Sequence, residues 1–582
     1  MKYIVRINDR KYTEWSVLDS TTLQEPEKDV EIDPIAMKIF SGDVVSVEGT
    51  DKETCKIDHS PVREQPCIAG VLDLKSNKTY GRDKSNGKML YRVLPDDTRL
   101  PVFLVPYEVK HMGFSKVMVN QYVTFKYDSW TSKHPVGRMT SVIGSVDTLQ
   151  NFYEYQLYCK SLHSSIQTFN KVTSKRVREF SQDHCMDHIL EKYAGIEDRR
   201  GDTWSVFTID PNNSTDFDDG FSLVRRDEGW ALSIYISNVS IILDALGLWD
   251  SFSRRVSTIY LPDRKRPMLP TILSDSLCSL QEKTTSFAFA MDIELDKDYD
   301  VVSVSYKNCA IRVSRNYRYE EKDLLKYKDY QQLHAIVCAM SSKKSYISSI
   351  DDSHDVVSYL MTFMNYRCAT FLLEKNVGIF RNSAFKSDAP ALPENIDPDV
   401  EKFVKMWYSS GGQYVNVENI KTDPQKSVRH ELMNMDAYIH ITSPIRRLVD
   451  LLNMIKIQEV TGMITFSENS AQFYDFWTSE KEMEFVNTTM RSIKRVQTDC
   501  SMLEFYTTNG DKVERDYTGV VFDRLHKQDG MVQYTVYLPE IKLTGRIFTQ
   551  THLENFTNHT FRIYLFHDED TLKRKVRLNL LS

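Results

Sequence analysis

Four aspartates crowd one short stretch of the chain, TIDPNNSTDFDDG at 208–220. Asp210, Asp216, Asp218 and Asp219 fall within ten consecutive positions, and no Lys or Arg lies among them. Carboxylates packed this closely repel one another, so the crowding favours a bound cation that neutralises them. Ligands made only of oxygen favour Mg²⁺, Mn²⁺ or Ca²⁺ over zinc. The stretch therefore indicates a site for a hard cation.

Two other interpretations fit an acidic stretch of this kind. A solvated acidic turn is the commoner outcome for a generic acidic loop. A calcium loop beginning at Asp216 would place Gly220 and Phe221 where that motif needs an acidic or Asn ligand and then Gly, so the motif fails. What remains is a magnesium site, and magnesium held by several Asp is a common means of phosphoryl chemistry.

A second segment, HITSPIRR at 440–447, supplies positive charge ahead of an apolar helical stripe. Ser443 is a good N-cap and Pro444 a good first helical residue, which places Arg446 in the first turn of the predicted helix. An Arg there lies beside free backbone N–H groups and the positive end of the helix, which suits a phosphate. Such an Arg pair is usually a surface feature, and it gains weight only beside the aspartates.

A third segment, RRVSTIYLPDRKRPMLP at 254–270, is locally basic in an acidic chain. Tyr260 is a candidate for stacking on a base, and Arg264 here and Arg447 in the second segment are candidates for holding phosphates. The simpler interpretation is an ordinary strand with solvated flanks.

The sequence patterns around these three segments predict the strands and helices that position them. Residues 1 to about 170 read as short strands with turns, which suggests two small β-barrels. Apolar residues alternate at 230–236 and 287–295, as in strands, and follow helical spacing at 357–372 and 448–455. Strand patterns return at 517–564, as in one more barrel. We expect domains at 1–65, 66–170, 175–505 and 508–582.

Composition sets the broad class. The 582 residues are 41% hydrophobic and 27% charged, with a net charge of −7, which is typical of a folded protein and leaves any attraction for RNA to local basic groups. Nine scattered cysteines without a CxxC pair favour a reducing compartment. No apolar run approaches the ~18 residues of a membrane span. We expect an intracellular protein without a membrane partner, cytoplasmic rather than nuclear, and monomeric.

Together the three segments resemble the RNB superfamily of exoribonucleases, which includes ribonuclease II, ribonuclease R and the catalytic exoribonuclease of the eukaryotic exosome. The resemblance rests on TIDPNNSTDFDDG at 208–220, STIYLPDRKRPMLPTILSDSLCSL at 257–280 and AYIHITSPIRRLVDLL at 437–452. It looks closest to the eukaryotic branch, without the endonuclease domain that the exosome subunit carries in front; association with an exosome is left open. The implied fold is a multidomain α+β protein, with an RNB catalytic domain flanked by two N-terminal cold-shock-like OB barrels and one C-terminal OB barrel.

The resemblance also implies roles for individual residues. Asp210, Asp216, Asp218 and Asp219 would bind Mg²⁺, or Mn²⁺ in its place, Arg446 would hold the reacting phosphate, and Tyr260 would stack near the 3′ end. The implied reaction is hydrolysis of single-stranded RNA from its 3′ end to nucleoside 5′-monophosphates. The alternative is an RNA-binding scaffold that has lost catalysis.

Several positions depart from the family's pattern. Asn238 stands in place of an Asp, Ile241 and Asn453 each in place of a His, Leu448 in place of a Tyr, and Gly220 where Ala is usual. None of them is an expected metal ligand, so they bear on substrate handling more than on chemistry.

Overall fold

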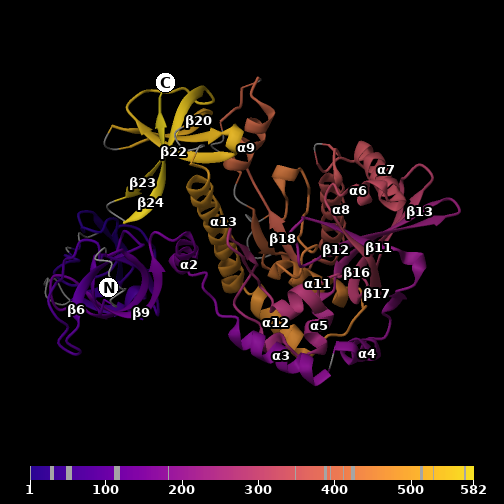
Figure 1. Ribbon diagram of the computed structural model, residues 1–582, viewed down its shortest axis with the longest axis horizontal. Helices are drawn as coiled ribbons and strands as arrows, with labels where there is room; N and C mark the ends of the chain where they lie inside the picture. Colours follow the sequence, from indigo (N-terminus) through magenta and orange to yellow (C-terminus); the bar gives the residue numbers. More distant parts are fainter. Residues whose placement is uncertain are drawn as a thin grey trace. The chain divides into compact units, whose positions relative to one another are not determined.

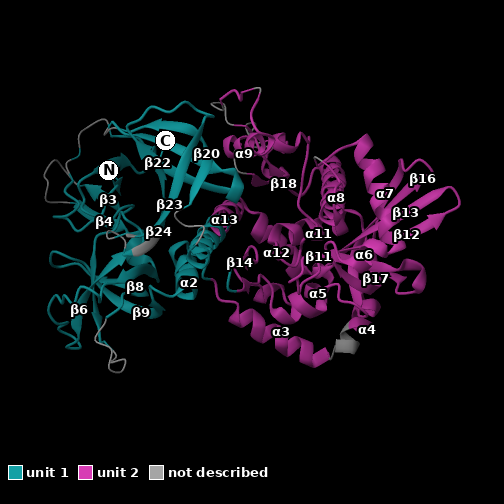
Figure 2. Cartoon of the chain, turned by 45° about the horizontal axis from the view of Figure 1, so that its top comes forward, with its two compact units in different colours: residues 1–163, 261–263, 494–582 teal, residues 164–260, 264–493 magenta. Residues whose placement is uncertain are grey.

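The computed structural model divides into two compact units, coloured separately in Figure 2. Unit 1 comprises residues 1–163, 261–263 and 494–582, and unit 2 comprises residues 164–260 and 264–493. The structure describes every residue except 1, 27–29, 31, 48–54, 110–117, 181, 348, 386–389, 394, 410–411, 421–426, 511–514, 528–529, 569–571 and 582.

Unit 1 is built of three β-structures. The first is a four-stranded sheet in the order β2-β1-β3-β4, formed by Trp15–Asp19, Lys2–Ile7, Val44–Val47 and Cys55–His59. The second is a closed barrel in the order β5-β6-β7-β9-β8, formed by Ile68–Leu72, Met89–Pro95, Phe103–Tyr107, Val136–Ser145 and Gln121–Ser129. One apolar cluster runs through both, and Phe40 stacks on Phe103 with ring centroids 5.8 Å apart.

The third β-structure of unit 1 is a five-stranded antiparallel sheet near the C-terminus. Its order is β22-β21-β20-β23-β24, formed by Leu543–Thr549, Val532–Leu538, Asp516–His526, Asn558–Asp568 and Lys573–Leu580. The helices beside these sheets include α1 (Pro61–Glu64), α2 (Leu149–Cys159) and the end of α13 (Glu480–Thr508), whose Tyr506 joins the core of the last sheet. The strands expected at 517–564 are therefore confirmed.

Unit 2 surrounds a six-stranded sheet with the order β10-β17-β11-β12-β13-β16 and a further β16–β17 pairing. Its strands are Glu197–Arg199, Val301–Arg318, Val206–Asp210, Asp219–Arg226, Gly229–Ser237 and Thr285–Asp296. The alternation at 230–236 and 287–295 is confirmed, because these residues pair in register as β13 and β16. A short hairpin, β14 (Ile259–Tyr260) with β15 (Lys265–Arg266), and a small sheet, β18 (Ile379–Asn382) with β19 (Gln413–Asn416), complete its β-structure.

Helices pack against this sheet, and Figure 1 shows α8 and α11 beside its strands. The α-helices are α3 (Gln167–Phe180), α4 (Gln182–Lys192), α5 (Val239–Ala245), α6 (Lys322–Lys326), α7 (Lys328–Lys343), α8 (Ser353–Lys375), α9 (Pro398–Tyr408), α10 (Val417–Ile420), α11 (Leu448–Val460) and α12 (Glu468–Thr478). The helices expected at 357–372 and 448–455 are confirmed as parts of α8 and α11. Asp352 caps α8 by accepting the Asp355 N–H, and Asn376 ends it in the left-handed conformation.

The architecture agrees with the predicted fold class, a multidomain α+β protein with OB-type β-structures beside a larger α/β unit. In the described part of the chain no helix is long and apolar enough to cross a membrane.

Candidate active site

The aspartate loop connects two adjacent strands of the unit 2 sheet. Asp210 is the last residue of β11 and Asp219 the first of β12, so both are anchored by the sheet. The loop itself is tied down at Phe217, whose N–H donates to Ser279 Oγ and whose carbonyl accepts the Leu280 N–H, both at 3.0 Å. Its backbone is therefore fixed before any ligand arrives.

Arg446 faces this loop and holds Asp218. Its Nε–H donates to Asp218 Oδ2 at 2.9 Å, and the Ile445 N–H donates to Asp218 Oδ1 at 3.0 Å. Asp218 is almost completely buried, and burial raises its pKa to about 6 although Arg446 acts in the opposite direction. The two segments that the sequence singled out therefore meet in space.

The helix start expected at Ser443 is wrong. The helix α11 begins at Leu448, and Arg446 belongs to a turn before it rather than to the first helical turn. The backbone explains why: Arg447 is extended, with φ −138° and ψ 126°, and forms a β-bridge with Ser257. The Arg446 carbonyl also accepts the Thr258 N–H at 2.9 Å. The position of Arg446 is thus set by the 257–258 segment, not by a helix N-terminus.

Asp216 faces a cation of the chain itself. Lys265, on the hairpin strand β15, donates to Asp216 Oδ1 at 2.8 Å and to Asp275 Oδ1 at 3.0 Å. It also donates to Thr215 Oγ1 at 2.6 Å. This lysine belongs to the basic segment but was not among the predicted site residues, because a sequence gives no direct sign of an ion pair between positions 49 residues apart.

The other two aspartates have buried oxygens that nothing in the described chain satisfies. Asp210 Oδ2 and Asp219 Oδ2 are inaccessible to solvent and have no hydrogen-bond partner among the described residues. Burial raises the pKa of both carboxyls, and their proximity to each other and to Asp218 raises it further. Unsatisfied buried carboxylate oxygens are costly, and a divalent cation is the ligand that relieves the cost. The residues present thus fit a hard cation.

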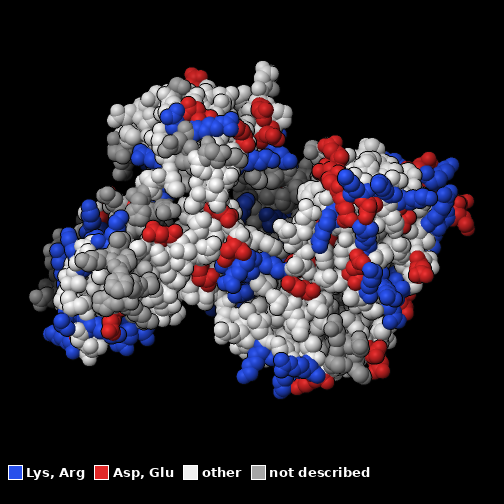
Figure 3. Space-filling model, viewed as in Figure 1, with Lys and Arg blue, Asp and Glu red and all other residues white. Residues whose placement is uncertain are grey.

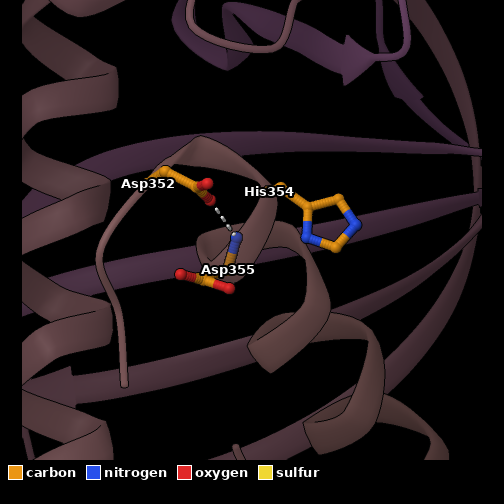
Figure 4. Close-up of side chains that lie close together, drawn as sticks. All are labelled: Asp352, His354 and Asp355. Atoms are coloured by element: carbon orange, nitrogen blue, oxygen red, sulfur yellow. Dashed lines mark hydrogen bonds between the residues drawn. The ribbon is translucent and has the colours of Figure 1, made fainter. Parts of the chain in front are cut away.

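The four carboxylates do not form a closed cage by themselves. Among the described residues, three His, Asp or Glu ligand atoms lie within 4.8 Å of one another only at Asp352, His354 and Asp355, at the start of α8. In Figure 4, Asp352 points to the backbone N–H of Asp355, which is a helix cap. Asp352 and His354 are exposed and Asp355 is half-buried, and the Asp352 carboxylate is already used by the helix cap, so we assign this group to capping and not to metal binding.

A cavity of about 830 Å³ opens in front of the aspartates. Tyr260 lines it with 43% of its surface exposed, as a stacking residue must, and Arg447 lines it while paired with Asp450 at 2.8 Å. Arg264 is exposed and is not part of the cavity wall. The structure thus brings together seven of the eight predicted site residues.

The cavity wall also contains residues that sequence reasoning did not assign a role. Tyr319, which directly follows β17, and His354, at the start of α8, lie against each other with ring centroids 5.2 Å apart. His440 is held by Tyr414, whose hydroxyl lies 2.8 Å from His440 Nδ1. Burial lowers the pKa of His440, and the neighbouring Arg447 and Arg381 lower it further, so this ring is neutral. None of the three carries a spacing signal in the sequence.

Asn365 connects α8 to the segment that leads to Arg446. Its Oδ1 accepts the Ile441 N–H at 3.0 Å, and its Nδ2 donates to the Tyr438 hydroxyl at 3.1 Å.

Two positions that depart from the family's pattern form hydrogen bonds within the fold. Asn453 accepts from the N–H of Ile379 and donates to its carbonyl, and Asn238 donates to Asn308 and Gln458.

On the face shown in Figure 3, both positive and negative side chains are scattered over the surface. The cavity itself has three cations in its lining, Arg446, Arg447 and Lys265, which provide local attraction for an anion.

Comparison with protein families and curated proteins agrees with these motifs. Residues 199–344 match the RNB domain. The chain is 23% identical over 332 residues to ribonuclease R of Chlamydia pneumoniae, covering 47% of this chain and 48% of that one. It is 24% identical over 515 residues to ribonuclease R of Ureaplasma parvum, covering 74% and 66%. It thus spans about half to two thirds of the length of these relatives. The recognition of an RNB domain related to ribonuclease R is confirmed.

Solved structures show the same fold over the whole chain. A Mycoplasma genitalium RNase R in complex with ribose-methylated single-stranded RNA aligns with a TM-score of 0.71 at 15% identity, covering all of both chains. Yeast Ssd1, described as a pseudonuclease, aligns with a TM-score of 0.61 at 14% identity, covering 94% of this chain and 79% of that one. The predicted fold class is confirmed. A special closeness to the eukaryotic branch stays a prediction.

Proposed function

We propose that this chain is a hydrolytic 3′→5′ exoribonuclease that degrades single-stranded RNA to nucleoside 5′-monophosphates with Mg²⁺, or Mn²⁺ in its place. The observation that carries the proposal is the pair of unsatisfied buried oxygens on Asp210 and Asp219, beside Arg446 and within a cavity lined by Tyr260. A scaffold without catalysis would have no need to keep this costly arrangement.

In this mechanism each residue has a separate task. Asp210, Asp216, Asp218 and Asp219 would hold the divalent ions, which would supply charge to activate a water and to stabilise the departing oxygen. Arg446 offers its guanidinium to the non-bridging oxygens of the terminal phosphodiester, since only its Nε is used by Asp218. Tyr260 stacks on a base near the 3′ end, and Arg447 and Arg264 contact phosphates further along the strand.

The products follow from the balance of the reaction. Water adds its oxygen to the phosphorus, the bond from phosphorus to the 3′ oxygen of the preceding nucleotide breaks, and that oxygen takes up a proton. The released nucleotide keeps its 5′-phosphate, and the shortened RNA keeps a 3′-hydroxyl ready for the next cycle.

We further propose the four-domain division given above, at 1–65, 66–170, 175–505 and 508–582, with the three smaller domains contacting RNA, and a monomeric state. The three separate β-structures at 2–59, 68–145 and 516–580 support this division.

The decisive experiment is a time course on 5′-labelled single-stranded RNA, with Mg²⁺, with Mn²⁺ and with chelator, resolved to single nucleotides. We expect metal-dependent shortening from the 3′ end to a short limit product, with 5′-mononucleotides released. RNA that stays intact over the same period while still bound to the protein would overturn the proposal and leave the scaffold function.

A further inference from the structure

A second, smaller cavity of about 240 Å³ lies in unit 2, away from the aspartates. It is bordered by the turn between β16 and β17, the end of α7 and the middle of α8. Its lining includes three cations, Lys343, Lys344 and Arg367, and three aromatic residues that neighbour them, Tyr346, Tyr359 and Tyr366. None of these residues belongs to the catalytic cavity described above.

The two cavities lie on opposite faces of α8. Residues 357, 358, 361, 362 and 365 of this helix line the catalytic cavity, and residues 359, 363, 366 and 367 line the smaller one. At about 100° per residue, the centres of these two groups are separated by roughly 150° around the helix axis. One rigid helix therefore presents a different set of side chains to each cavity.

Two of the three cations have no acidic partner. Lys343 is neutralised by Asp300, at 2.7 Å. Lys344 and Arg367, in contrast, form no ion pair with any carboxylate in the described part of the chain. Arg367 is also only partly exposed, so its charge has given up hydration without receiving an anion in return. Lys344 is exposed and keeps its hydration, so Arg367 is the cation that most favours an anionic ligand, and Lys344 adds a second positive charge on the same cavity wall.

The tyrosine rings on the cavity wall offer a second kind of contact, which is stacking with a planar group. Lys344 Nζ lies 4.1 Å from the ring centroid of Tyr366 and 5.4 Å from that of Tyr346. The two rings lie 5.8 Å apart at 45° to each other. A cation over these rings is a weak interaction that an anion in the cavity would outcompete, because a charge-assisted hydrogen bond is the stronger contact. When Lys344 turns to the anion, it uncovers a ring face on which a planar group stacks.

We propose that this cavity binds one nucleotide, with Lys344 and Arg367 holding its phosphate and Tyr366 or Tyr346 stacking on its base. Pockets for drug-sized ligands have volumes of about 300–1,000 Å³, so a cavity of about 240 Å³ limits the ligand to one nucleotide. A carboxylate or inorganic phosphate would satisfy the cations and leave the aromatic faces unused. The ligand is either a free 5′-mononucleotide or one nucleotide of an RNA strand. This goes beyond the proposed exoribonuclease reaction, which uses only the cavity on the other face of α8.

Photolabelling of the full chain with 8-azidoadenosine 5′-monophosphate, in chelator, tests the proposal without relying on activity. We expect label on Tyr346 or Tyr366, located by fragmentation of the labelled peptide, in addition to any label on the residues of the catalytic cavity. Competition by unlabelled AMP should be at least about tenfold stronger than competition by adenosine or by inorganic phosphate, since each lacks half of the ligand.

Substitutions at Arg367 and Lys344 test whether these two residues hold the phosphate of the bound nucleotide. Arg367→Met and Lys344→Met should each reduce labelling of Tyr346 or Tyr366 at least about tenfold, while label in the catalytic cavity stays unchanged. The matched control is Lys375→Met, which also removes a cation that lies over a ring on α8, here Phe371 at 5.9 Å, but outside this cavity. Equal labelling of the two tyrosines in wild type, Arg367→Met and Lys344→Met would overturn the proposal, as would the absence of label on both tyrosines in the wild type.

A second arm distinguishes the two sources of the nucleotide. A single-stranded RNA of nine nucleotides, in chelator, should displace the label from Tyr346 and Tyr366 more effectively than AMP if the cavity holds part of a strand, and less effectively if it holds a free mononucleotide. Loss of RNA degradation with normal labelling would contradict the exoribonuclease and leave this site standing, so the two proposals fail separately.

Discussion

Arg446 donates its Nε–H to Asp218 at 2.9 Å, across 228 positions of the sequence. The arginine is fixed to the 257–258 segment by its own carbonyl, and the aspartate is fixed by the backbone of Ser237 and Ile445. Both side chains are therefore oriented before substrate or metal binds. Because the contact uses Nε, the outer nitrogens of the guanidinium stay available for a phosphate.

This contact makes Asp218→Asn a sharp test of catalysis. The amide oxygen still accepts the Ile445 N–H, so the loop should fold normally, but the carboxylate charge is lost and the amide nitrogen cannot accept the Arg446 Nε–H. We expect the rate of RNA shortening to fall at least about a hundredfold, with binding of single-stranded RNA unchanged or tighter because one negative charge has gone. Single-turnover kinetics and filter binding measure the two effects. Asp250→Asn, on an exposed acid that bonds only Asn469, is the control and should behave as wild type.

The pKa shifts at the site predict an unusual pH dependence of stability for the metal-free protein. Burial raises the pKa of Asp218 to about 6 from 3.8, and burial together with neighbouring carboxylates raises the pKa of Asp210 and Asp219. The folded state thus binds protons more tightly than the unfolded chain, and the free energy of unfolding should fall as pH rises from about 4 through 6 to 7. Thermal melts in chelator at pH 5 and pH 8 measure this.

The Asp219→Asn variant and added Mn²⁺ are two independent controls for the predicted pH dependence of stability. Asp219→Asn should stabilise the metal-free protein at pH 8 by on the order of 2 kcal/mol, because a buried charge is removed. Adding Mn²⁺ at pH 8 should raise the melting temperature of the wild type and have little effect on the variant. A wild type that becomes more stable between pH 5 and pH 8 in chelator would show that these carboxyls are not held in their protonated form.

Lys265 occupies a carboxylate oxygen of Asp216, so in the proposed metal site it would compete with the metal. Its ammonium lies 2.8 Å from Asp216 Oδ1 and is shared with Asp275, so a cation binding at Asp216 must displace or share it. We expect Lys265→Met to lower the Mn²⁺ concentration for half-saturation several-fold, measured by electron paramagnetic resonance of free Mn²⁺ and by the metal dependence of RNA shortening. Lys283→Met, on an exposed lysine paired with Glu282, is the matched control. A higher half-saturation concentration in Lys265→Met would mean that the lysine positions Asp216 for the metal.

The sequence predicted which residues meet at the candidate site better than it predicted their surroundings. The aspartates, Arg446 and Tyr260 line one cavity, and local runs of residues pointed to them, just as local alternation predicted the strands at 230–236 and 287–295. Lys265 was missed because its role arises from an ion pair with Asp216, which only the folded hairpin creates. The start of α11 was misplaced because Ser443 and Pro444 give a strong local signal that the β-bridge at Arg447 overrides.

Tyr260 offers a test of substrate stacking that leaves the metal centre intact. It lies at the end of β14 with much of its ring exposed to the catalytic cavity. Loss of one stacked base costs about 1–3 kcal/mol, so Tyr260→Ala should weaken binding of single-stranded RNA by roughly tenfold or more and lengthen the limit product. Tyr260→Phe keeps the ring and should stay within about twofold of wild type. Equal binding by the Ala and Phe variants would remove Tyr260 from the stacking role.

Asn365 gives the last prediction, because it links α8 to the segment that carries Arg446. Replacement by Leu, which has a similar volume, leaves the buried N–H of Ile441 without its acceptor and should cost about 1–3 kcal/mol of unfolding free energy. It should also slow RNA shortening at saturating metal, since the 438–446 segment loses its tie to the helix. Asn365→Asp keeps the acceptor for Ile441 but buries a carboxyl, so it should recover part of the stability at pH 5, where that carboxyl is more readily protonated, and less at pH 8. Denaturant unfolding and single-turnover rates of the two variants test this, and an Asn365→Leu protein as stable and as active as wild type would contradict it.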